Sequence, residues 1–444
     1  MNVYIETLGC SKNRVDSEIM AGTLLGDGYE ICFEPSEASI IIVNTCGFLA
    51  SAVEESIERI LSLSQFKTEG NCKVLIAAGC LIERYRENLM SEIPELDILL
   101  GTSDYTDILK KTDEYLKEQK QIHKLKSSPF YSDNNYSANR ALSTSSYAYL
   151  KIAEGCSNTC SFCNIPKLRG KQTSRSISSI NNEIKELLES GYKEINLISQ
   201  DCSSYGSDSP KNEDLASLID SILTTHSQDF WLRIFYSYPN RFPIEIVNMM
   251  KNDSRLVPYI DLPLQHISDP VLKKMNRRIT RREIEQLIEA ILNRYDDVAL
   301  RTTLIVGFPN ETEKEFKELL RFIEMGYFHH LGVFCYSHED NTTAYKYGDP
   351  ISEDEKVERR DQIMEAQQKI SEQKNLAMVG QIQKVLVEGR YEETDLLIKG
   401  RNRYQGPEVD GLVLINEGDT KINAFNEVEI VDAHPYDLIG RIKS

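Results

Sequence analysis

The sequence predicts an α/β protein in three parts: a parallel α/β domain over residues 1–125, an open (β/α)6 barrel over residues 142–375 and a small β-barrel over residues 378–444. Three observations predict this division. Short apolar runs alternate with helical stretches at the start of the chain and again after residue 146. A polar stretch rich in Lys, Ser, Asn and Asp separates these two regions. The end of the chain changes to short strands punctuated by glycine, without helices between them.

The first domain is built on three apolar runs, NVYIETL, ASIIIVN and KVLIAA, with amphipathic segments between them near residues 16–25 and 53–63. Buried strands that are joined through helices pair in parallel. Their carboxyl ends therefore meet at one edge of the sheet, which is where open α/β sheets bind ligands.

Six strand candidates follow a helix tail and linker over residues 111–146: YAYLKIAE, KEINLIS, FWLRIFY, VPYIDLP, VALRTTLIV and HLGVFCYS. Six strand–helix units are too few to close an eight-fold barrel. They fit an open barrel whose functional loops follow the carboxyl ends of the strands. A charged helix over residues 353–378 leads to the last domain, whose short strands are typical of a β-barrel of the oligonucleotide-binding type.

Composition and charge restrict the class of protein. The chain is 41% hydrophobic and has no run of about 18 apolar residues, so no membrane span is predicted. The start does not resemble a signal peptide, and we expect a cytoplasmic protein. Ten cysteines in a long chain in that reducing compartment indicate metal binding or catalysis rather than disulfides. A net charge of −18 opposes binding to a phosphate backbone unless basic residues gather locally.

The densest cysteine motif is GCSNTCSFC, in which Cys156, Cys160 and Cys163 form a C-x3-C-x2-C array directly after a predicted strand. Three thiolates at this spacing hold one face of a [4Fe-4S] cube and leave one iron open for chemistry. A zinc site or a plain electron-transfer cluster would use a fourth protein ligand. No such ligand follows before Lys167, so both alternatives are weaker.

This array resembles that of the radical S-adenosylmethionine superfamily, whose motif has an aromatic residue where Phe162 stands. The resemblance implies that S-adenosylmethionine (SAM) chelates the open iron and is cleaved on one-electron reduction, with Phe162 against its adenine. It also implies that the strand through Ile305 and Gly307 lines the cofactor, although a tight strand-to-helix turn explains Gly307 equally well. Gln200, at the end of another barrel strand, is a further candidate for a cofactor or substrate contact.

The segment that follows the fourth barrel strand contains two candidates for substrate recognition. His266 and Arg277 are placed to meet an anionic side chain such as aspartate. A buried core role explains His266 equally well.

Three other cysteines share a position in the first domain. Cys10, Cys46 and Cys80 each end one of its predicted strands. Because parallel strands end at the same edge, these thiols should converge and hold a second [4Fe-4S] cluster with one open position. A single free cysteine is more often a small buried hydrophobe, and it is the repeated placement that favours ligands. The other four cysteines are interpreted as structural: Cys32, Cys72, Cys202 and Cys335.

With the domain order, these motifs resemble the methylthiotransferase family, which joins a three-cysteine domain, a radical barrel and a C-terminal TRAM domain. The resemblance covers the whole chain and implies two [4Fe-4S] clusters, one that holds the transferred sulfur and one that cleaves SAM. The phrases ETLGCSKNRVDSE, YLKIAEGCSNTCSFCNIP and YIDLPLQHISDPVLKKMNR are most similar to the branch that modifies an aspartate β-carbon of ribosomal protein S-twelve. The alternative is a tRNA adenosine methylthiotransferase, whose typical YGCQMN, QNV and LPVQSGS phrases are not found here. The implied partners are that ribosomal protein and an electron donor such as flavodoxin or ferredoxin.

The charge of the last domain agrees with a protein substrate. From Gln381 onward it carries eight Lys or Arg and twelve Asp or Glu residues, a balance of −4. An acidic surface suits a basic ribosomal protein better than RNA, so RNA contact is not required. An ordinary solvated acidic face explains the excess equally well. If the domain binds substrate, deleting the residues after Met378 should weaken that binding and leave cofactor cleavage largely intact.

Overall fold

The structure is a computed structural model that describes residues 1–126, 129, 131–133, 140–210 and 213–443. Its contacts divide the chain into two compact units, each with its own parallel sheet. The first unit comprises Met1–Ser143, Lys151–Thr159 and Cys163–Glu183, and the second comprises Thr144–Leu150, Cys160–Phe162 and Ile184–Ser444. The helices of the described residues include none that is both long enough and apolar enough for a membrane span.

The first unit contains a parallel five-stranded sheet in the order β2-β1-β3-β4-β5, which confirms the predicted parallel α/β domain. Every residue of β3 (IIIVNT) and β4 (VLIAAG) is buried. Strands that are buried on both faces need helices on both sides of the sheet. The strands are β1 (Asn2–Thr7), β2 (Glu30–Ile31), β3 (Ile40–Thr45), β4 (Val74–Gly79) and β5 (Ile98–Leu100).

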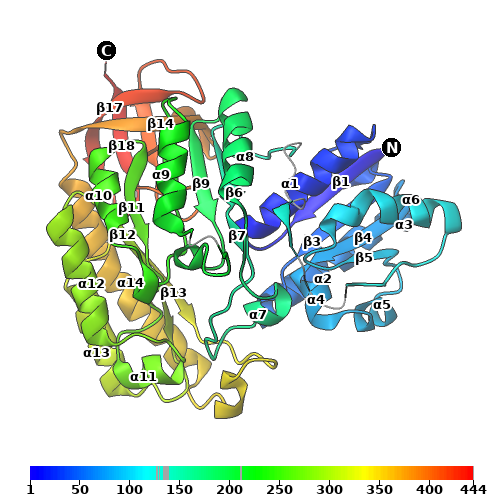
Figure 1. Ribbon diagram of the computed structural model, residues 1–444, viewed down its shortest axis with the longest axis horizontal. Coiled ribbons are helices and arrows are strands. Elements are labelled where there is room, and N and C mark those ends of the chain that lie inside the picture. The colour runs from blue at the N-terminus through cyan, green and yellow to red at the C-terminus, as the bar shows by residue number, and fades with distance from the viewer. Residues whose placement is uncertain (127–128, 130, 134–139, 211–212, 444) are drawn as a thin grey trace. The chain divides into compact units, whose positions relative to one another are not determined.

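Helices cover both faces of this sheet (Figure 1). Val53 and Ile60 of α2 pack with Ile41 and Val43 of β3 on one face. On the other face α1 contacts α6 and β1, and α6 contacts β5. The helices are α1 (Ser11–Gly26), α2 (Ala50–Ser64), α3 (Phe66–Glu69), α4 (Cys80–Tyr85), α5 (Asn88–Glu92) and α6 (Ile108–Glu118).

The predicted linker over residues 111–146 begins inside a helix, because α6 ends only at Glu118. Part of the linker, residues 127–128, 130 and 134–139, lies outside the described residues. Beyond it Arg140 is buried and pairs with Glu18 and Glu183, each at 2.5 Å. These two ion pairs fix the end of the linker to the first unit.

The second unit contains a parallel sheet of six strands in the order β13-β12-β11-β10-β9-β6, and its two end strands do not pair with each other among the described residues. The predicted open six-stranded barrel is therefore confirmed. The strands are β6 (Tyr147–Lys151), β9 (Glu194–Ile198), β10 (Trp231–Ile234), β11 (Leu256–Asp261), β12 (Ala299–Val306) and β13 (His330–Cys335). The helices that follow them are α8 (Ile177–Glu189), α9 (Leu215–Thr225), α10 (Glu245–Asn252), α11 (Asp269–Lys274), α12 (Arg281–Arg294), α13 (Glu313–Glu324) and α14 (Glu353–Leu376). Short elements of the first unit lie between β6 and α8: β7 (Ala153–Glu154), α7 (Ile165–Leu168) and β8 (Thr173–Ser174).

Local sequence sets the start of several of these helices. Thr280 caps α12 and Thr312 caps α13, each in a reciprocal capping box with the glutamate three residues later. Each box satisfies backbone N–H groups that the first turn of a helix leaves without a partner.

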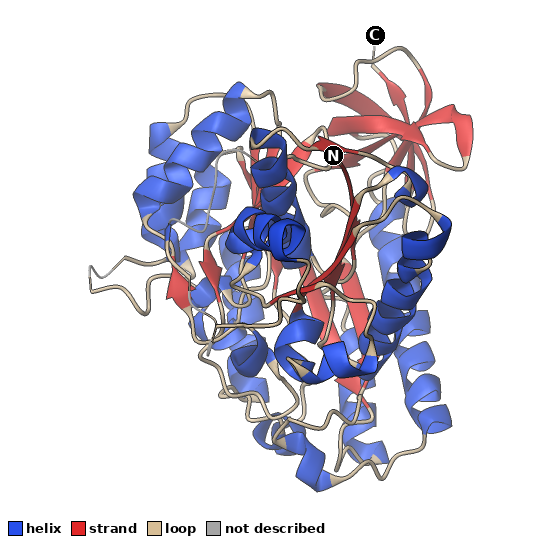
Figure 2. Cartoon of the chain, turned by 90° about the vertical axis from the view of Figure 1, so that its right-hand side faces the viewer, coloured by secondary structure: helices blue, strands red, loops and turns tan. Residues whose placement is uncertain are grey.

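The chain ends in a closed barrel of five strands in the order β14-β15-β16-β18-β17 (Figure 2), as predicted. Alternate residues point inward, so that Val385 and Val387 of β14 meet Val428 and Ile430 of β17 in its core. The strands are β14 (Ile382–Tyr391), β15 (Thr394–Asn402), β16 (Val413–Glu417), β17 (Phe425–Ala433) and β18 (Leu438–Ile442).

Within the second unit this barrel packs against the amino ends of the six parallel strands. Arg401 of β15 is fully buried and donates to Glu194, the first residue of β9, at 2.5 Å. Trp231, the first residue of β10 and the only tryptophan, has its ring 4.9 Å from that of Phe425. The carboxyl ends of the strands lie at the opposite end of the sheet.

Candidate functional site

The three cysteines of the first unit follow neighbouring strands. β1, β3 and β4 are adjacent in the sheet, with Thr7 opposite Asn44 and Thr45 opposite Gly79. The strands therefore end at nearly the same level, and Cys10, Cys46 and Cys80 follow within a few residues. The predicted convergence of these thiols at one sheet edge agrees with the structure.

Two glycines let the cysteine loops approach one another closely. A Cβ on Gly9 would lie 2.9 Å from Cys46 Cβ and 3.3 Å from its Sγ. A Cβ on Gly79, whose φ is +97°, would lie 2.5 Å from Asn44 Oδ1 and 2.6 Å from the Thr45 carbonyl oxygen. A side chain at Gly9 would displace the Cys46 side chain, and a side chain at Gly79 would displace the backbone next to Cys46.

Amide side chains tie the first two cysteine loops together. Asn13 Nδ2 donates to the Leu8 carbonyl at 2.8 Å and to the Thr45 carbonyl at 3.0 Å. Asn44 Nδ2 donates in turn to the Asn13 carbonyl at 2.8 Å. These bonds satisfy buried carbonyl groups where the strands end, and they hold the chain on either side of Cys10 and Cys46.

Arg169 is a buried charge beside this edge that the sequence interpretation did not assign. Its guanidinium donates to Asn13 Oδ1 at 2.6 Å and pairs with Asp16 at 3.0 Å and Glu154 at 2.6 Å. Its positive charge also lies close enough to the Cys80 thiol to lower the pKa of that thiol. No local signal in the sequence indicates the contacts with Asn13 and Asp16, because these residues lie more than 150 positions away from Arg169.

Burial raises the pKa of the Cys80 thiol to about 12 and raises the pKa of Cys46 as well. Arg169 lowers both pKa values, but by less than burial raises them. The free thiols are therefore protonated at neutral pH, and binding of a metal centre must release protons.

The described residues contain no ready site for a single metal ion. Within the described residues, no group of three or more His, Cys, Asp or Glu side chains is close enough to bind one metal ion. Tetrahedral zinc needs its ligands to converge on one point. A four-iron cluster binds each cysteine through a different iron, so its ligands surround a volume.

The C-x3-C-x2-C array lies in the loop that follows β7. The Cys156 N–H donates to the Gly170 carbonyl at 3.1 Å, and Cys163 Sγ accepts from the Ile165 N–H at 3.5 Å. Arg277 Nη1 lies 3.7 Å from Cys160 Sγ, and its guanidinium stacks 3.8 Å from the centre of the Tyr238 ring. Arg277 thus contacts a predicted cluster ligand, and this was not the role considered for it.

Asn164 directly follows the third cysteine of the array. It is 2% exposed, and neither polar atom of its side chain has a hydrogen-bond partner among the described residues. An unsatisfied buried amide is costly, and a bound group beside Cys163 would satisfy it. Asn164 is therefore a candidate ligand contact that the sequence interpretation missed.

Phe162 and Ile305, two predicted cofactor residues, meet in one apolar cluster. Both are half-buried and pack with a buried group of side chains. The members of that group are Val271, Met275, Phe308, Tyr336 and Ala344. The structure thus brings together residues that are far apart in sequence, as contact with one cofactor requires.

Gly307 has a structural role in the turn after β12. Its N–H donates to Glu311 Oε2 at 3.0 Å, and a Cβ at this φ of +74° would lie 2.3 Å from Lys356 Cγ. Fully buried His266 has its Nε2 3.5 Å from the same Glu311 oxygen. His266 is therefore buried, as its core interpretation expects, and its contact with a substrate side chain stays a prediction.

One polar candidate lies in the middle of β9 and another in the loop after this strand. Gln200 is half-buried two residues after β9. Asn196 is fully buried on the same face of β9 as Glu194, and its side chain has no hydrogen-bond partner among the described residues. The alternation in EINLI was the signal for Asn196, a second candidate ligand contact that was missed.

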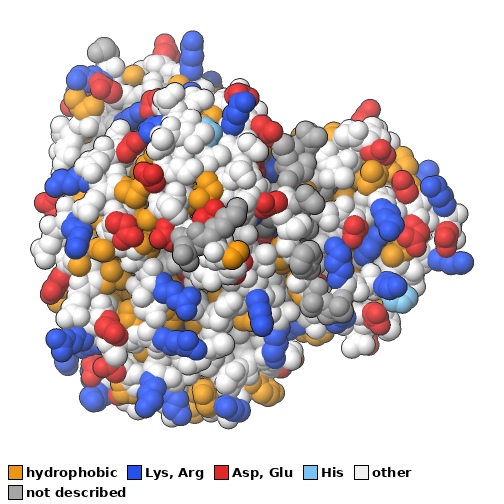
Figure 3. Space-filling model, viewed as in Figure 1, with side chains coloured by type: hydrophobic (Ala, Val, Ile, Leu, Met, Phe, Trp, Pro, Cys, Tyr) orange, Lys and Arg blue, Asp and Glu red, His pale blue; other side chains and the backbone are white. Residues whose placement is uncertain are grey.

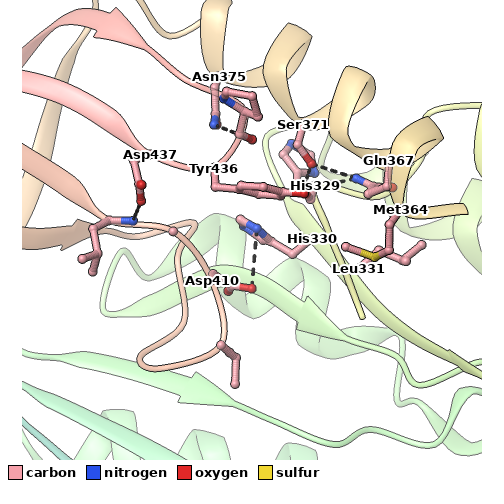
Figure 4. Close-up of a pocket in the computed structure, with 14 residues that line it drawn as sticks. His329, His330, Leu331, Met364, Gln367, Ser371, Asn375, Asp410, Tyr436 and Asp437 are labelled. Carbon is pink, nitrogen blue, oxygen red and sulfur yellow. Dashed lines mark hydrogen bonds and ion pairs between the residues drawn. The ribbon is translucent and has the colours of Figure 1, made fainter. Parts of the chain in front are cut away.

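A cavity of about 400 Å³ lies elsewhere in the second unit, between β13, α14 and loops of the C-terminal barrel (Figure 4). His330, Gln367, Asp410 and Tyr436 are among its lining residues. Because His330 begins β13, the cavity lies at the amino end of that strand. It is therefore distinct from the strand end that carries Phe162 and Ile305.

Models of three known families match the chain in order. They are the uncharacterized protein family UPF0004 at residues 2–101, the radical SAM superfamily at residues 150–323 and the TRAM domain at residues 379–442. The matches follow the order of the three predicted parts.

Curated relatives match over nearly their whole length. The ribosomal protein uS12 methylthiotransferase RimO of Geobacter sulfurreducens is 44% identical over 443 residues, which cover 100% of this chain and 98% of that protein. The protein of the same name from Trichlorobacter lovleyi is 43% identical, with 99% and 98% covered. That from Bdellovibrio bacteriovorus is 43% identical, with 99% and 97% covered.

Solved structures share the fold at low sequence identity. The apo form of the cobalamin-dependent SAM radical enzyme OxsB has a TM-score of 0.54 at 14% identity, covering 82% of this chain and 56% of that one. The radical SAM methyltransferase TsrM from Kitasatospora setae, with cobalamin and a [4Fe-4S] cluster bound, has a TM-score of 0.50 at 12% identity, covering 75% and 71%. At these identities the likeness concerns the fold alone.

Proposed function

Because the chain belongs to the RimO family of radical SAM methylthiotransferases, we propose that it places a methylthio group on the β-carbon of an aspartate in ribosomal protein uS12. The observation that carries the proposal is the 42–44% identity over essentially the full length of relatives with that activity in their names. The three matching family models, in the order expected of a methylthiotransferase, support it.

We assign Cys156, Cys160 and Cys163 to the [4Fe-4S] cluster that binds SAM. When bound, the cluster and SAM together supply a one-electron cleavage that yields a carbon radical. The protein's task is to orient SAM and exclude water from it. Phe162 and Ile305 present adjacent apolar surface for the adenine. The assignments of Gln200 and Gly307 to SAM rest on their positions at strand ends, and the N–H of Gly307 is already used by Glu311.

We assign Cys10, Cys46 and Cys80 to a second [4Fe-4S] cluster whose open iron holds the sulfur to be transferred. Arg169 supports this assignment, since a buried guanidinium beside three thiolates offsets part of their negative charge. Its contacts with Asp16 and Glu154 hold the guanidinium in one position.

The partners and the location follow from this reaction. The substrate is a ribosomal protein, and the electron donor is a low-potential carrier such as flavodoxin or ferredoxin. We propose a cytoplasmic location, where ribosomes and reduced thiols occur together.

The test is to offer the reconstituted enzyme uS12 and tRNA separately and to follow the mass of each. Addition of a methylthio group to the uS12 aspartate is expected. A mass gain on tRNA alone would contradict the proposal and favour the tRNA adenosine alternative. Zinc in place of iron in the purified protein would contradict the radical mechanism.

Cysteine variants test the division of labour between the clusters. Cys156→Ala should lose about half of the bound iron, since one of two equal clusters is removed, and all cleavage of SAM. Cys80→Ala should keep SAM cleavage and lose methylthio transfer. Cys32→Ala, in the same unit but outside the cluster set, is the control and should keep both activities. The reverse pattern of defects would show that the two clusters had been exchanged.

A further inference from the structure

We propose that exposed basic residues around Cys160 form a docking surface for an acidic protein that carries one electron at a time. The inference rests on the proposed function, because it takes Cys160 as a ligand of a cluster that is reduced in every turnover. The segment over residues 273–282, KKMNRRITRR, contains six basic residues and no acidic residue, in a chain of net charge −18. We define the basic rim as exposed side chains of this segment and its neighbours: Arg241, Lys273, Lys274, Arg278, Arg282 and Lys346.

Hydrogen bonds hold the cysteine loop between two parts of the rim. The Ser161 N–H donates to the Met275 carbonyl at 2.9 Å, and Ser161 Oγ donates to the Lys274 carbonyl at 2.8 Å. From the other side, the Ala344 N–H donates to the Ser161 carbonyl at 2.7 Å. Ser161 adjoins Cys160, so the rim is fixed next to this cysteine. In Figure 3, Lys and Arg side chains are numerous over the lower face, where Figure 1 places α11.

Contacts also connect the parts of the rim to one another. The ammonium groups of Lys274 and Lys346 lie 4.9 Å and 5.7 Å from the centre of the same Tyr347 ring. Asn240, next to Arg241, donates through Nδ2 to the Arg278 carbonyl at 2.8 Å. The rim is therefore one surface rather than a set of scattered charges.

Nearby acidic side chains are bound locally. Asp269 accepts the Arg281 N–H at 2.7 Å, and Glu283 accepts from Thr280 in the cap of α12. Glu285 pairs with the Arg281 side chain at 2.8 Å. These three carboxylates keep their charge, but the six basic residues of the segment and the two others of the rim outnumber them.

Arg277 links the rim to the cysteine. It belongs to the basic segment but is only 8% exposed, and its Nη1 lies 3.7 Å from Cys160 Sγ. Its second guanidinium nitrogen donates to the Pro263 carbonyl at 2.5 Å. A partner on the rim would thus be separated from the cluster by little protein, as electron transfer requires.

The chemistry of the reaction favours an electron carrier over RNA as the occupant. One electron leaves the carrier and is consumed in breaking one carbon–sulfur bond of one SAM, which gives methionine and a 5'-deoxyadenosyl radical. The carrier must therefore reach this cluster and leave it in each turnover. Short-lived electron-transfer complexes have small interfaces and are steered by opposite charge. RNA binding uses many phosphate contacts along an extended strand, whereas this rim is compact and the rest of the chain is acidic.

The test compares two reductants on the holoenzyme with charge-reversal variants. The rim variant carries Lys273→Glu, Arg278→Glu and Arg282→Glu. With reduced flavodoxin at low ionic strength, its 5'-deoxyadenosine formation should fall about tenfold or more, mainly through a higher KM for flavodoxin. With excess dithionite, which reduces the cluster without protein docking, its rate should stay close to that of the unmodified enzyme. Added salt should slow only the flavodoxin-driven reaction of the unmodified enzyme.

A matched control separates the rim from overall charge. Lys314→Glu, Lys317→Glu and Arg321→Glu on exposed positions of α13 change the net charge by the same amount, and both rates should be unchanged. The inference is overturned if the rim variant accepts electrons from flavodoxin as well as the control does. It is also overturned, in favour of RNA, if that variant loses only methylthio transfer to ribosomal particles and keeps transfer to isolated uS12. If the unmodified enzyme does not cleave SAM with dithionite, the proposed function is contradicted, and the inference, which rests on it, is contradicted as well.

Discussion

Replacing Arg401 by methionine should loosen the C-terminal barrel from the six-stranded sheet. Its fully buried guanidinium holds Glu194 of β9 and Glu388 of β14, each at 2.5 Å. Glu194 also pairs with Arg233 at 2.8 Å, so that four side chains form a neutral group. Methionine keeps the aliphatic part of the side chain and leaves the two carboxylates with one guanidinium fewer. Removal of one partner of a buried ion pair costs about 3–5 kcal/mol.

Trp231 reports this change, because it is the only tryptophan, is 2% exposed and packs on Phe425 of the C-terminal barrel. The full-length Arg401→Met variant and the unmodified chain are each unfolded in urea. The wavelength of the tryptophan emission maximum is followed as the urea concentration rises. With a slope of about 2 kcal/mol per molar urea, the loss lowers the midpoint of the Trp231 transition by roughly 1.5–2.5 M.

Lys384→Met is the matched control at the same interface. Lys384 pairs with Asp229 at 2.8 Å, but the two side chains are 42% and 65% exposed. The expected loss is below about 1 kcal/mol, because water screens an exposed pair. A midpoint for Arg401→Met no lower than that of Lys384→Met would refute the reasoning that burial makes the Arg401 pairs essential.

Three further predictions concern single positions. Arg169→Met should destabilise the first unit by about 3–5 kcal/mol and lower the iron retained per chain after gel filtration, and Arg169→Lys should restore part of that iron. Gly307→Ala combines a positive φ with a clash against Lys356, so its unfolding temperature should fall more than that of Gly348→Ala, where φ is +73° and the space is open. Burial lowers the pKa of His329 well below its usual value; the unfolded chain therefore takes up the proton first, and stability should fall as pH drops below about 6.5. His329→Gln should flatten this loss in urea titrations at several pH values, and an unchanged slope would contradict it.

The sequence predicted the three sheets and the cysteine positions because these depend on periodicity and chain direction. Cys10, Cys46 and Cys80 each follow an apolar run, and parallel strands have a common carboxyl edge whatever the loops do. Contacts between distant segments have no such signal. Arg169 meets Asp16 across more than 150 residues, and nothing in either local sequence identifies the other.

Contacts that the sequence did not reveal also change the expected effect of deleting the residues after Met378. The acidic charge of the last domain suggested only a role in binding substrate. The structure shows that it also covers Trp231 and supplies Arg401 to buried Glu194. Its removal would expose apolar surface and leave Glu194 with Arg233 alone. We therefore expect the deletion to destabilise the radical barrel, so that loss of SAM cleavage would not identify a catalytic role for the domain.

Local arrangement of charge matters more in this chain than the net charge of −18. A cluster held by three thiolates is negatively charged and becomes more so on reduction, which a uniformly acidic protein would oppose. Each proposed cluster set instead has a buried arginine against one of its cysteines, Arg169 at Cys80 and Arg277 at Cys160. Arg169 is largely offset by Asp16 and Glu154, whereas no ion pair of Arg277 with a carboxylate is found among the described residues. The positive charge beside Cys160 should therefore be the less compensated of the two, which favours reduction at the cluster that must accept the electron.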